Sequence, residues 1–242
     1  MAIKTTFNYS LNFSPKKRHK KQIKFIIIHY TGMKKESEAI ERLTDINSEV
    51  SSHYLIKNSG DVVVLVPDLY ISWHAGKSNW KNFNSLNKNS IGIEISNSGH
   101  QYNYKKFSKK QINSLIKLIK LLIKKYKINY KNILGHSDIA PVRKKDPGEK
   151  FPWGYLGKKR IVLWHHLSKH KLKKLRKVKI DIMKQNLFIK NLSKIGYPKT
   201  STQKNNKNNI YIIKAFQRRF RQELIDGKID EECLAISKKL IN

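Results

Sequence analysis

Residues 25–32 read Phe-Ile-Ile-Ile-His-Tyr-Thr-Gly, and the interpretation of the whole chain starts from this stretch. Four consecutive apolar residues followed by a glycine turn are typical of a short buried β-strand. His29 then lies at the end of the strand, where functional side chains are common. Because a single histidine at a strand end is more often structural than a ligand, its role depends on the residues that accompany it.

Other short β-branched segments and one long helical pattern surround this strand. Further strands are predicted at residues 53–57, 62–67 and 91–96, with a hairpin turn at 58–61. Ser108 is a favourable N-cap for an amphipathic helix that runs to about Tyr126. Residues 37–44 predict a second, shorter helix. This mixture indicates an α/β domain over residues 24–157.

The remainder of the chain divides into a basic segment and a helical region. Residues 158–179 contain ten Lys or Arg and no acidic residue, which favours a linker or a solvated helix. A patch for nucleic acid or wall anions is the alternative interpretation of this segment. Apolar residues at helical spacing then predict three helices at 181–196, 208–222 and 230–241, with a polar loop at 197–209. Such a unit can fold as a small helical domain.

The composition sets limits on the class of protein. The 242 residues include 51 Lys or Arg and 17 Asp or Glu, so the net charge is +34, while 39% hydrophobic residues supply a packed core. This charge predicts nonspecific attraction to polyanions such as nucleic acid or an acidic wall polymer. A composition rich in Lys, Asn and Ile also arises from an AT-rich genome, so the charge is weak evidence of purpose. Cys233 is the only cysteine, which excludes an internal disulfide and a thiolate metal cluster.

No segment approaches the ~20 apolar residues that a membrane-spanning helix requires. Residues 1–24 lack the apolar core of a signal peptide. These features favour a cytoplasmic protein that is made without classical export.

A second histidine and two carboxylates accompany His29. His136 follows a short strand that ends at Gly135, and Asp146 comes ten residues later. Two neutral imidazoles and one carboxylate, with a fourth position left for water, are a typical catalytic zinc set. Glu94 lies in the otherwise apolar run Ile-Gly-Ile-Glu-Ile, where an unpaired carboxylate is costly to bury. It is either part of a buried ion pair or a general base with a raised pKa, and a nearby metal favours the base.

Six motifs in order now resemble the N-acetylmuramoyl-L-alanine amidases of the amidase-2 (peptidoglycan recognition protein-like) family. They are His-Tyr-Thr-Gly at 29–32, Ser-His-Tyr-Leu-Ile at 52–56, Trp-His-Ala-Gly at 73–76, Ile-Gly-Ile-Glu at 91–94, Gly-His-Ser-Asp-Ile-Ala-Pro at 135–141 and Lys-Lys-Asp-Pro-Gly-Glu-Lys-Phe-Pro-Trp at 144–153. The resemblance implies a mixed central β-sheet flanked by helices, one bound Zn²⁺, and hydrolysis of the amide between N-acetylmuramic acid and L-alanine of the stem peptide. Peptidoglycan fragments or the cell wall are then the expected partners.

The resemblance also implies a role for particular residues. It assigns His29, His136 and Asp146 to the metal, Glu94 to general base and acid catalysis, and Lys144 to the oxyanion. Relatives carry a tyrosine where this chain has Ser52, so Ser52 receives no catalytic role, and its neighbour His53 is expected to be structural. His74 and Trp73 are candidate substrate contacts, although His74 could instead support the metal site or stabilise its loop. Trp73 and Trp80 could each stack on a sugar or simply close the loop.

The C-terminal region resembles the three-helix peptidoglycan-binding-like domain. The resemblance is carried by Leu-Ser-Lys-Ile-Gly-Tyr at 192–197 and Ala-Phe-Gln-Arg-Arg-Phe at 215–220, whose aromatic residues we expect in the core. The predicted organisation is an N-terminal extension at 1–23, a catalytic domain at 24–157, a basic linker at 158–180 and the helical domain at 181–242. A wall-binding region favours the cell envelope as the alternative location.

Two other functions compete with the amidase. A recognition protein of the same fold binds muropeptide without cleaving it, but such proteins typically lack one metal ligand. A nucleic-acid-binding protein fits the charge, but stacking aromatics among the cations and a reading helix are not evident.

Overall fold

The structure of the chain is a computed structural model that describes residues 4–198 and 207–242. A six-stranded mixed sheet forms its centre, in the order β1-β5-β4-β9-β3-β10. Only the β4–β5 pair is antiparallel within this sheet. The strands are β1 (Thr5–Phe7), β5 (Val62–Val64), β4 (Tyr54–Ile56), β9 (Ser90–Ile95), β3 (Phe25–Ile28) and β10 (Ile133–Gly135). The predicted α/β class is therefore confirmed.

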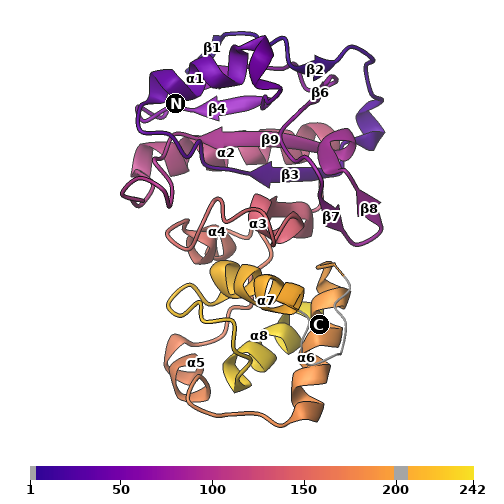
Figure 1. Cartoon of the computed structure of the whole chain (residues 1–242), viewed down its shortest axis with the longest axis vertical. Coiled ribbons are helices and arrows are strands. Elements are labelled where there is room, and N and C mark those ends of the chain that lie inside the picture. Colours follow the sequence, from indigo (N-terminus) through magenta and orange to yellow (C-terminus); the bar gives the residue numbers. More distant parts are fainter. Residues whose placement is uncertain (1–3, 199–206) are drawn as a thin grey trace.

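Helix α2 (Lys109–Tyr126) covers one face of the sheet. Ser108 caps it in the predicted manner, because the Gln111 backbone N–H donates to Ser108 Oγ at 3.2 Å and the Ser108 N–H to Gln111 Oε1 at 2.9 Å. Its apolar side packs on Ile26 and Ile28 of β3 and on alternate residues of β9. Helix α1 (Glu36–Thr44) packs beside β4 and β5 through Leu43, so helices flank the sheet (Figure 1).

The N-terminal segment belongs to this domain in the structure. β1 pairs in parallel with β5, and β2 (Phe13–Ser14) pairs with β6 (Ile71–Ser72). Arg18 is 5% exposed and donates to the carbonyls of Asp68, Asn87, Lys88 and Ser90. Residues 4–23 are therefore attached to the sheet by backbone pairing and by one buried guanidinium.

The remaining helices gather below β3 in Figure 1, on the side of the sheet that ends in β10. They are α3 (His136–Ile139), α4 (Trp153–Lys158), α5 (Lys169–Leu175), α6 (Ile182–Ile195), α7 (Lys207–Phe220) and α8 (Glu231–Ile241), and a small hairpin of β7 (Asn79–Trp80) and β8 (Phe83–Asn84) lies beside them. The basic segment contains α5 and buries Ile161, Val162 and Leu172. Most of the predicted loop at 197–209 lies outside the described residues. No described helix combines the length and hydropathy that a membrane crossing requires.

Candidate active site

Three site residues reach one edge of the sheet because their strands are parallel and in register. Ile28 of β3 lies opposite Ile93 of β9 and opposite Gly135 of β10. The residue after each of these positions therefore lies at the carboxyl end of its strand, which places His29 between Glu94 and His136. Ligand sites in α/β sheets commonly occupy this edge.

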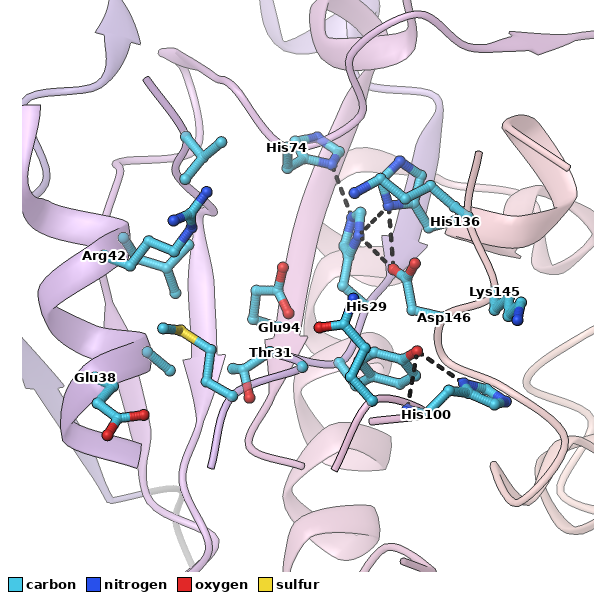
Figure 2. A pocket seen from close by; sticks show the side chains of 18 of the residues that line it. His29, Thr31, Glu38, Arg42, His74, Glu94, His100, His136, Lys145 and Asp146 are labelled. Atoms are coloured by element: carbon cyan, nitrogen blue, oxygen red, sulfur yellow. Dashed lines mark hydrogen bonds and ion pairs between the residues drawn. The ribbon is translucent and has the colours of Figure 1, made fainter. Parts of the chain in front are cut away.

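Asp146 completes the group from the loop that follows α3. Its Oδ2 lies 3.1 Å from His29 Nδ1 and 3.1 Å from His136 Nδ1, and the two Nδ1 atoms are 2.9 Å apart (Figure 2). The three residues are each 7% exposed or less. The Asp146 carbonyl accepts the Ser137 backbone N–H at 2.9 Å, which ties the loop to α3.

The protonation states of this group suit a metal ion. Burial, reinforced by His136, lowers the pKa of His29 to about 4, so its imidazole is neutral near pH 7. Burial alone would raise the pKa of Asp146, but the neighbouring imidazoles of His136 and His29 hold it below its usual range. The neutral imidazole of His29 and a carboxylate oxygen of Asp146 are therefore available to a cation.

The spacing of the three atoms also fits a metal. In a tetrahedral zinc site with bonds of 2.0–2.1 Å, neighbouring ligand atoms are about 3.3 Å apart. The observed separations of 2.9–3.1 Å are within a few tenths of an ångström of that value. His29, His136 and Asp146 can thus hold one metal ion without rearrangement of the backbone.

The outer nitrogens of both histidines are engaged as well. His136 Nε2 donates to the Ala75 carbonyl at 3.1 Å, and His29 Nε2 lies 3.0 Å from His74 Nδ1. His74 Nε2 in turn lies 3.0 Å from Ser90 Oγ, whose hydroxyl donates to the Leu86 carbonyl. One tautomer assignment satisfies this series and leaves both Nδ1 atoms unprotonated towards Asp146.

His74 can occupy this position because residue 92 is glycine. A Cβ atom on Gly92 would lie 2.5 Å from His74 Cγ, so any larger residue would displace the imidazole from β9. The Ile-Gly-Ile-Glu run thus presents Glu94 and leaves space for His74.

Glu94 lines the same pocket as the three ligand residues, but its pKa is shifted in the opposite direction from that of Asp146. Its Oε2 is buried and has no hydrogen-bond partner among the described residues. Burial, reinforced by the charge of Asp146 and opposed by Lys144, raises the pKa of Glu94 to about 8. A carboxyl group with these properties can accept and release a proton near neutral pH.

All seven predicted site residues line one pocket of about 760 Å³. Lys144 and Trp73 lie on its wall with the ligand group, Glu94 and His74. Trp80 lies elsewhere, buried against the Tyr197 ring. His53 is fully buried and accepts the Gly92 backbone N–H at 3.0 Å, while Ser52 donates to the Gly92 carbonyl, so both have structural contacts.

The far wall of the pocket was not identified from the sequence. Arg42 and Glu38 reach it from α1, opposite the ligand group (Figure 2). Exposed charges on a helix are usually solvated, so their spacing gives no signal until α1 is placed beside β4.

An α/β enzyme with a candidate metal site at the carboxyl edge of its sheet is the class that this geometry defines. The sequence profile of the N-acetylmuramoyl-L-alanine amidase family (Amidase_2) matches residues 19–149. The chain belongs to this family, and the predicted assignment to an N-acetylmuramoyl-L-alanine amidase is confirmed.

Individual relatives agree with the family match. The chain is 34% identical over 235 residues to the N-acetylmuramoyl-L-alanine amidase AmiD of Escherichia coli, covering 91% of this chain and 83% of AmiD. It is 40% identical over 105 residues to the 1,6-anhydro-N-acetylmuramyl-L-alanine amidase AmpD of Haemophilus influenzae, covering 43% of this chain and 55% of AmpD.

Solved structures extend the similarity to the C-terminal helices. AmiD in complex with anhydro-N-acetylmuramic acid-L-Ala-D-γ-Glu-L-Lys superposes with a TM-score of 0.78 at 33% identity, over 91% of this chain and 89% of that one. AmpDh3 of Pseudomonas aeruginosa in complex with anhydromuramic pentapeptide gives a TM-score of 0.77 at 29% identity, over 94% and 93%.

Proposed function

We propose that this amidase uses one Zn²⁺ ion, held by His29, His136 and Asp146, to hydrolyse the amide between N-acetylmuramic acid and L-alanine. The observation that carries the proposal is the convergence of these three ligand atoms beside Glu94 in a single pocket. A zinc ion there supplies Lewis acidity, which lowers the pKa of water and polarises the scissile carbonyl.

Glu94 moves the proton in this proposal. Its carboxylate takes a proton from the attacking water and passes it to the leaving L-alanine nitrogen. The absence of competing hydrogen bonds at Oε2 among the described residues, together with the raised pKa, suits a group that must hold a proton briefly.

Lys144 supports the charge that develops on the carbonyl oxygen. Its backbone N–H donates to the Ala140 carbonyl at 2.9 Å, which fixes the residue at the start of the loop that carries Asp146. An ammonium group on the wall of a protein pocket stabilises an oxyanion more strongly than the same group in bulk water.

His74 and Trp73 divide the roles that the sequence left open. Both His74 nitrogens are engaged, so we assign His74 to the orientation of His29 rather than to the substrate. Trp73 is held by its backbone N–H, which donates to Ser51 Oγ at 2.9 Å, and its ring lines the pocket where a sugar can stack.

The anhydro form of muramic acid is the preferred substrate in this proposal. AmiD and AmpDh3 were both solved with anhydromuramic peptides, and both resemble this chain over about nine-tenths of its length. Recycling of such fragments fits a cytoplasmic location, whereas cleavage of intact wall fits the envelope, and the C-terminal helices would then bind peptidoglycan.

One assay tests the activity and the choice of substrate. Release of free stem peptide is measured from a defined anhydromuropeptide and from intact sacculi. Glu94→Ala and chelated protein should lose cleavage of both substrates, zinc should restore the chelated sample, and Glu41→Ala on the exposed face of α1 should match wild type. A fully active Glu94→Ala variant would refute the mechanism, and muropeptide binding without cleavage by the zinc-loaded protein would favour a recognition protein.

The charge predicts a separate property of the purified protein. With a net charge of +34 it should bind nucleic acid without sequence preference, and the affinity should fall steeply with salt. Affinity that persists in molar salt would contradict a purely electrostatic origin.

A further inference from the structure

A buried carboxylate two residues after His136 joins the catalytic region to the C-terminal helices. Asp138, fully buried on α3, accepts hydrogen bonds from Arg219 Nη1 at 2.6 Å, from the Tyr197 hydroxyl at 2.7 Å and from the Gly135 backbone N–H at 2.8 Å. Arg219 and Tyr197 come from the C-terminal helical region. We call these three side chains the Asp138 junction.

The Asp138 junction contacts the chain on both sides of His136. Gly135 immediately precedes His136, and its N–H is held by Asp138. Arg219 also donates through Nη2 to the Ile133 carbonyl on β10 at 3.0 Å. One guanidinium from α7 thus binds the strand that leads into His136 and the helical turn that follows it.

The end of α7 and the residues just after it hold the segment that follows Asp146. Gln222 Nε2 donates to the carbonyls of Glu149 and Phe151, at 2.5 and 2.6 Å, and Arg218 lies 3.8 Å from the Glu149 carboxylate. Both the second and the third predicted ligands are therefore followed, within a few residues, by contacts to this helix.

The two regions also share one hydrophobic core. Phe25 and Ile27 of β3 and Leu134 of β10 belong to the same buried cluster as Phe188 and Phe216 of the C-terminal helices. Gly196, with a φ of 137°, lets the chain approach Trp80 so closely that a Cβ atom would lie 2.4 Å from the indole. A module attached only by a flexible linker would not need such contacts.

We propose that the C-terminal helical region positions the metal ligands, and that Arg219 and Tyr197 act on His136 through Asp138. This inference rests on the proposed zinc site. A buried, fully hydrogen-bonded carboxylate has one stable arrangement, so α3 and the His136 imidazole are fixed before the metal binds. Partners beyond the ligands themselves typically change metal affinity by about 10–100-fold when removed.

Two variants and one matched control separate positioning from general stability. Tyr197→Phe removes one buried hydroxyl that faces Asp138, and Arg219→Met removes the guanidinium. Ser237→Ala removes one buried hydroxyl from α8 in the same helical region, where it accepts from Asn191 Nδ2 at 3.1 Å and makes no hydrogen bond to the Asp138 junction. The full chain is used in every case.

The measurements are the zinc dissociation constant, by competition with a chromophoric chelator, and hydrogen exchange of residues 133–146 in metal-free protein, both below the unfolding temperature of every variant. We expect zinc affinity to fall about 3-fold in Tyr197→Phe and about 10-fold or more in Arg219→Met, with faster exchange in that segment. Ser237→Ala should stay within about 2-fold of wild type.

The outcomes distinguish this proposal from the function on which it rests. Wild type that binds no zinc refutes the zinc site itself. Wild type that binds zinc, with Tyr197→Phe and Arg219→Met indistinguishable from Ser237→Ala, refutes positioning alone. If Arg219→Met does not fold, Tyr197→Phe decides the question, because its ring still packs on Trp80 and Phe216.

Discussion

Two carboxylates near the candidate metal site, Asp138 and Glu94, differ in their hydrogen bonding. Asp138 accepts three hydrogen bonds, one of them from a buried guanidinium, whereas Glu94 Oε2 has none among the described residues. A buried carboxylate whose hydrogen bonds are all made stabilises the fold around it. A carboxyl group without hydrogen-bond partners is instead free to exchange a proton. Asp138 therefore belongs to a stable support behind His136, and Glu94 belongs to a reactive edge of the site.

The largest expected effect tests the reactive edge. Glu94→Gln keeps the shape of the side chain but cannot accept a proton, so peptide release should fall by about 10²–10⁴-fold. The thermal unfolding temperature should not fall, because no hydrogen bond to Oε2 is lost. Peptide release and thermal unfolding are measured on the same zinc-loaded sample. A fall in stability without loss of activity would reverse the roles assigned to the two carboxylates.

A substitution of Asp138 in the stable support should instead lower the stability of the fold. Asp138→Asn leaves the Arg219 guanidinium buried without its counter-charge, so the free energy of unfolding should fall by about 3–5 kcal/mol. Urea unfolding measures this change. Asp61→Asn, whose partner Lys4 is exposed, is the matched control and should change it by less than about 1 kcal/mol.

A double variant then identifies the cause. Asp138→Asn with Arg219→Met removes both charges and should recover part of the lost stability. If the double variant is less stable than Asp138→Asn alone, the unpaired guanidinium is not the source of the loss.

The sequence predicted the reactive edge better than the support. The central strands, α2 and the seven pocket residues follow from apolar periodicity and from motifs, because a strand end places its next residue predictably. The Ala-Phe-Gln-Arg-Arg-Phe signature predicted that Phe216 and Phe220 are in the core, and both are buried. Arg219 in the same signature could not be assigned, since its partner is 81 residues away and an arginine on a helix is normally solvated.

The short edge strands were missed for a related reason. Thr5–Phe7 is three residues long and exposed, so its pairing with β5 leaves no alternation to detect. His74 could be found by its motif, but its contact with His29 depends on the space at Gly92, which only the fold shows.

A smaller effect concerns pH in the metal-free protein. The folded-state pKa of Glu94, about 8, lies above the ordinary value of 4.5, so the folded chain retains a proton that the unfolded chain releases. The resulting stabilisation is complete below about pH 4.5 and is lost as the pH rises through about 8. Urea midpoints of wild type should therefore fall relative to Glu94→Gln between pH 5 and pH 9. If the urea midpoints of the two proteins change in parallel with pH, the pKa of Glu94 is not raised in the folded state.

The smallest expected change in stability concerns a third carboxylate, Asp68, which is hydrogen-bonded like Asp138 but whose charged partner is exposed. Asp68 is buried and accepts from Lys125 at 2.8 Å and from the hydroxyls of Tyr54 and Tyr126, but the Lys125 side chain is 54% exposed. Because solvent already screens that ammonium and two donors remain after its removal, Lys125→Met should change the free energy of unfolding by less than about 1 kcal/mol. The free energies of unfolding of Lys125→Met and Asp138→Asn are measured by urea unfolding under the same conditions and compared. A loss as large as that of Asp138→Asn would show that the number of partners, and not their burial, determines which carboxylates support this fold.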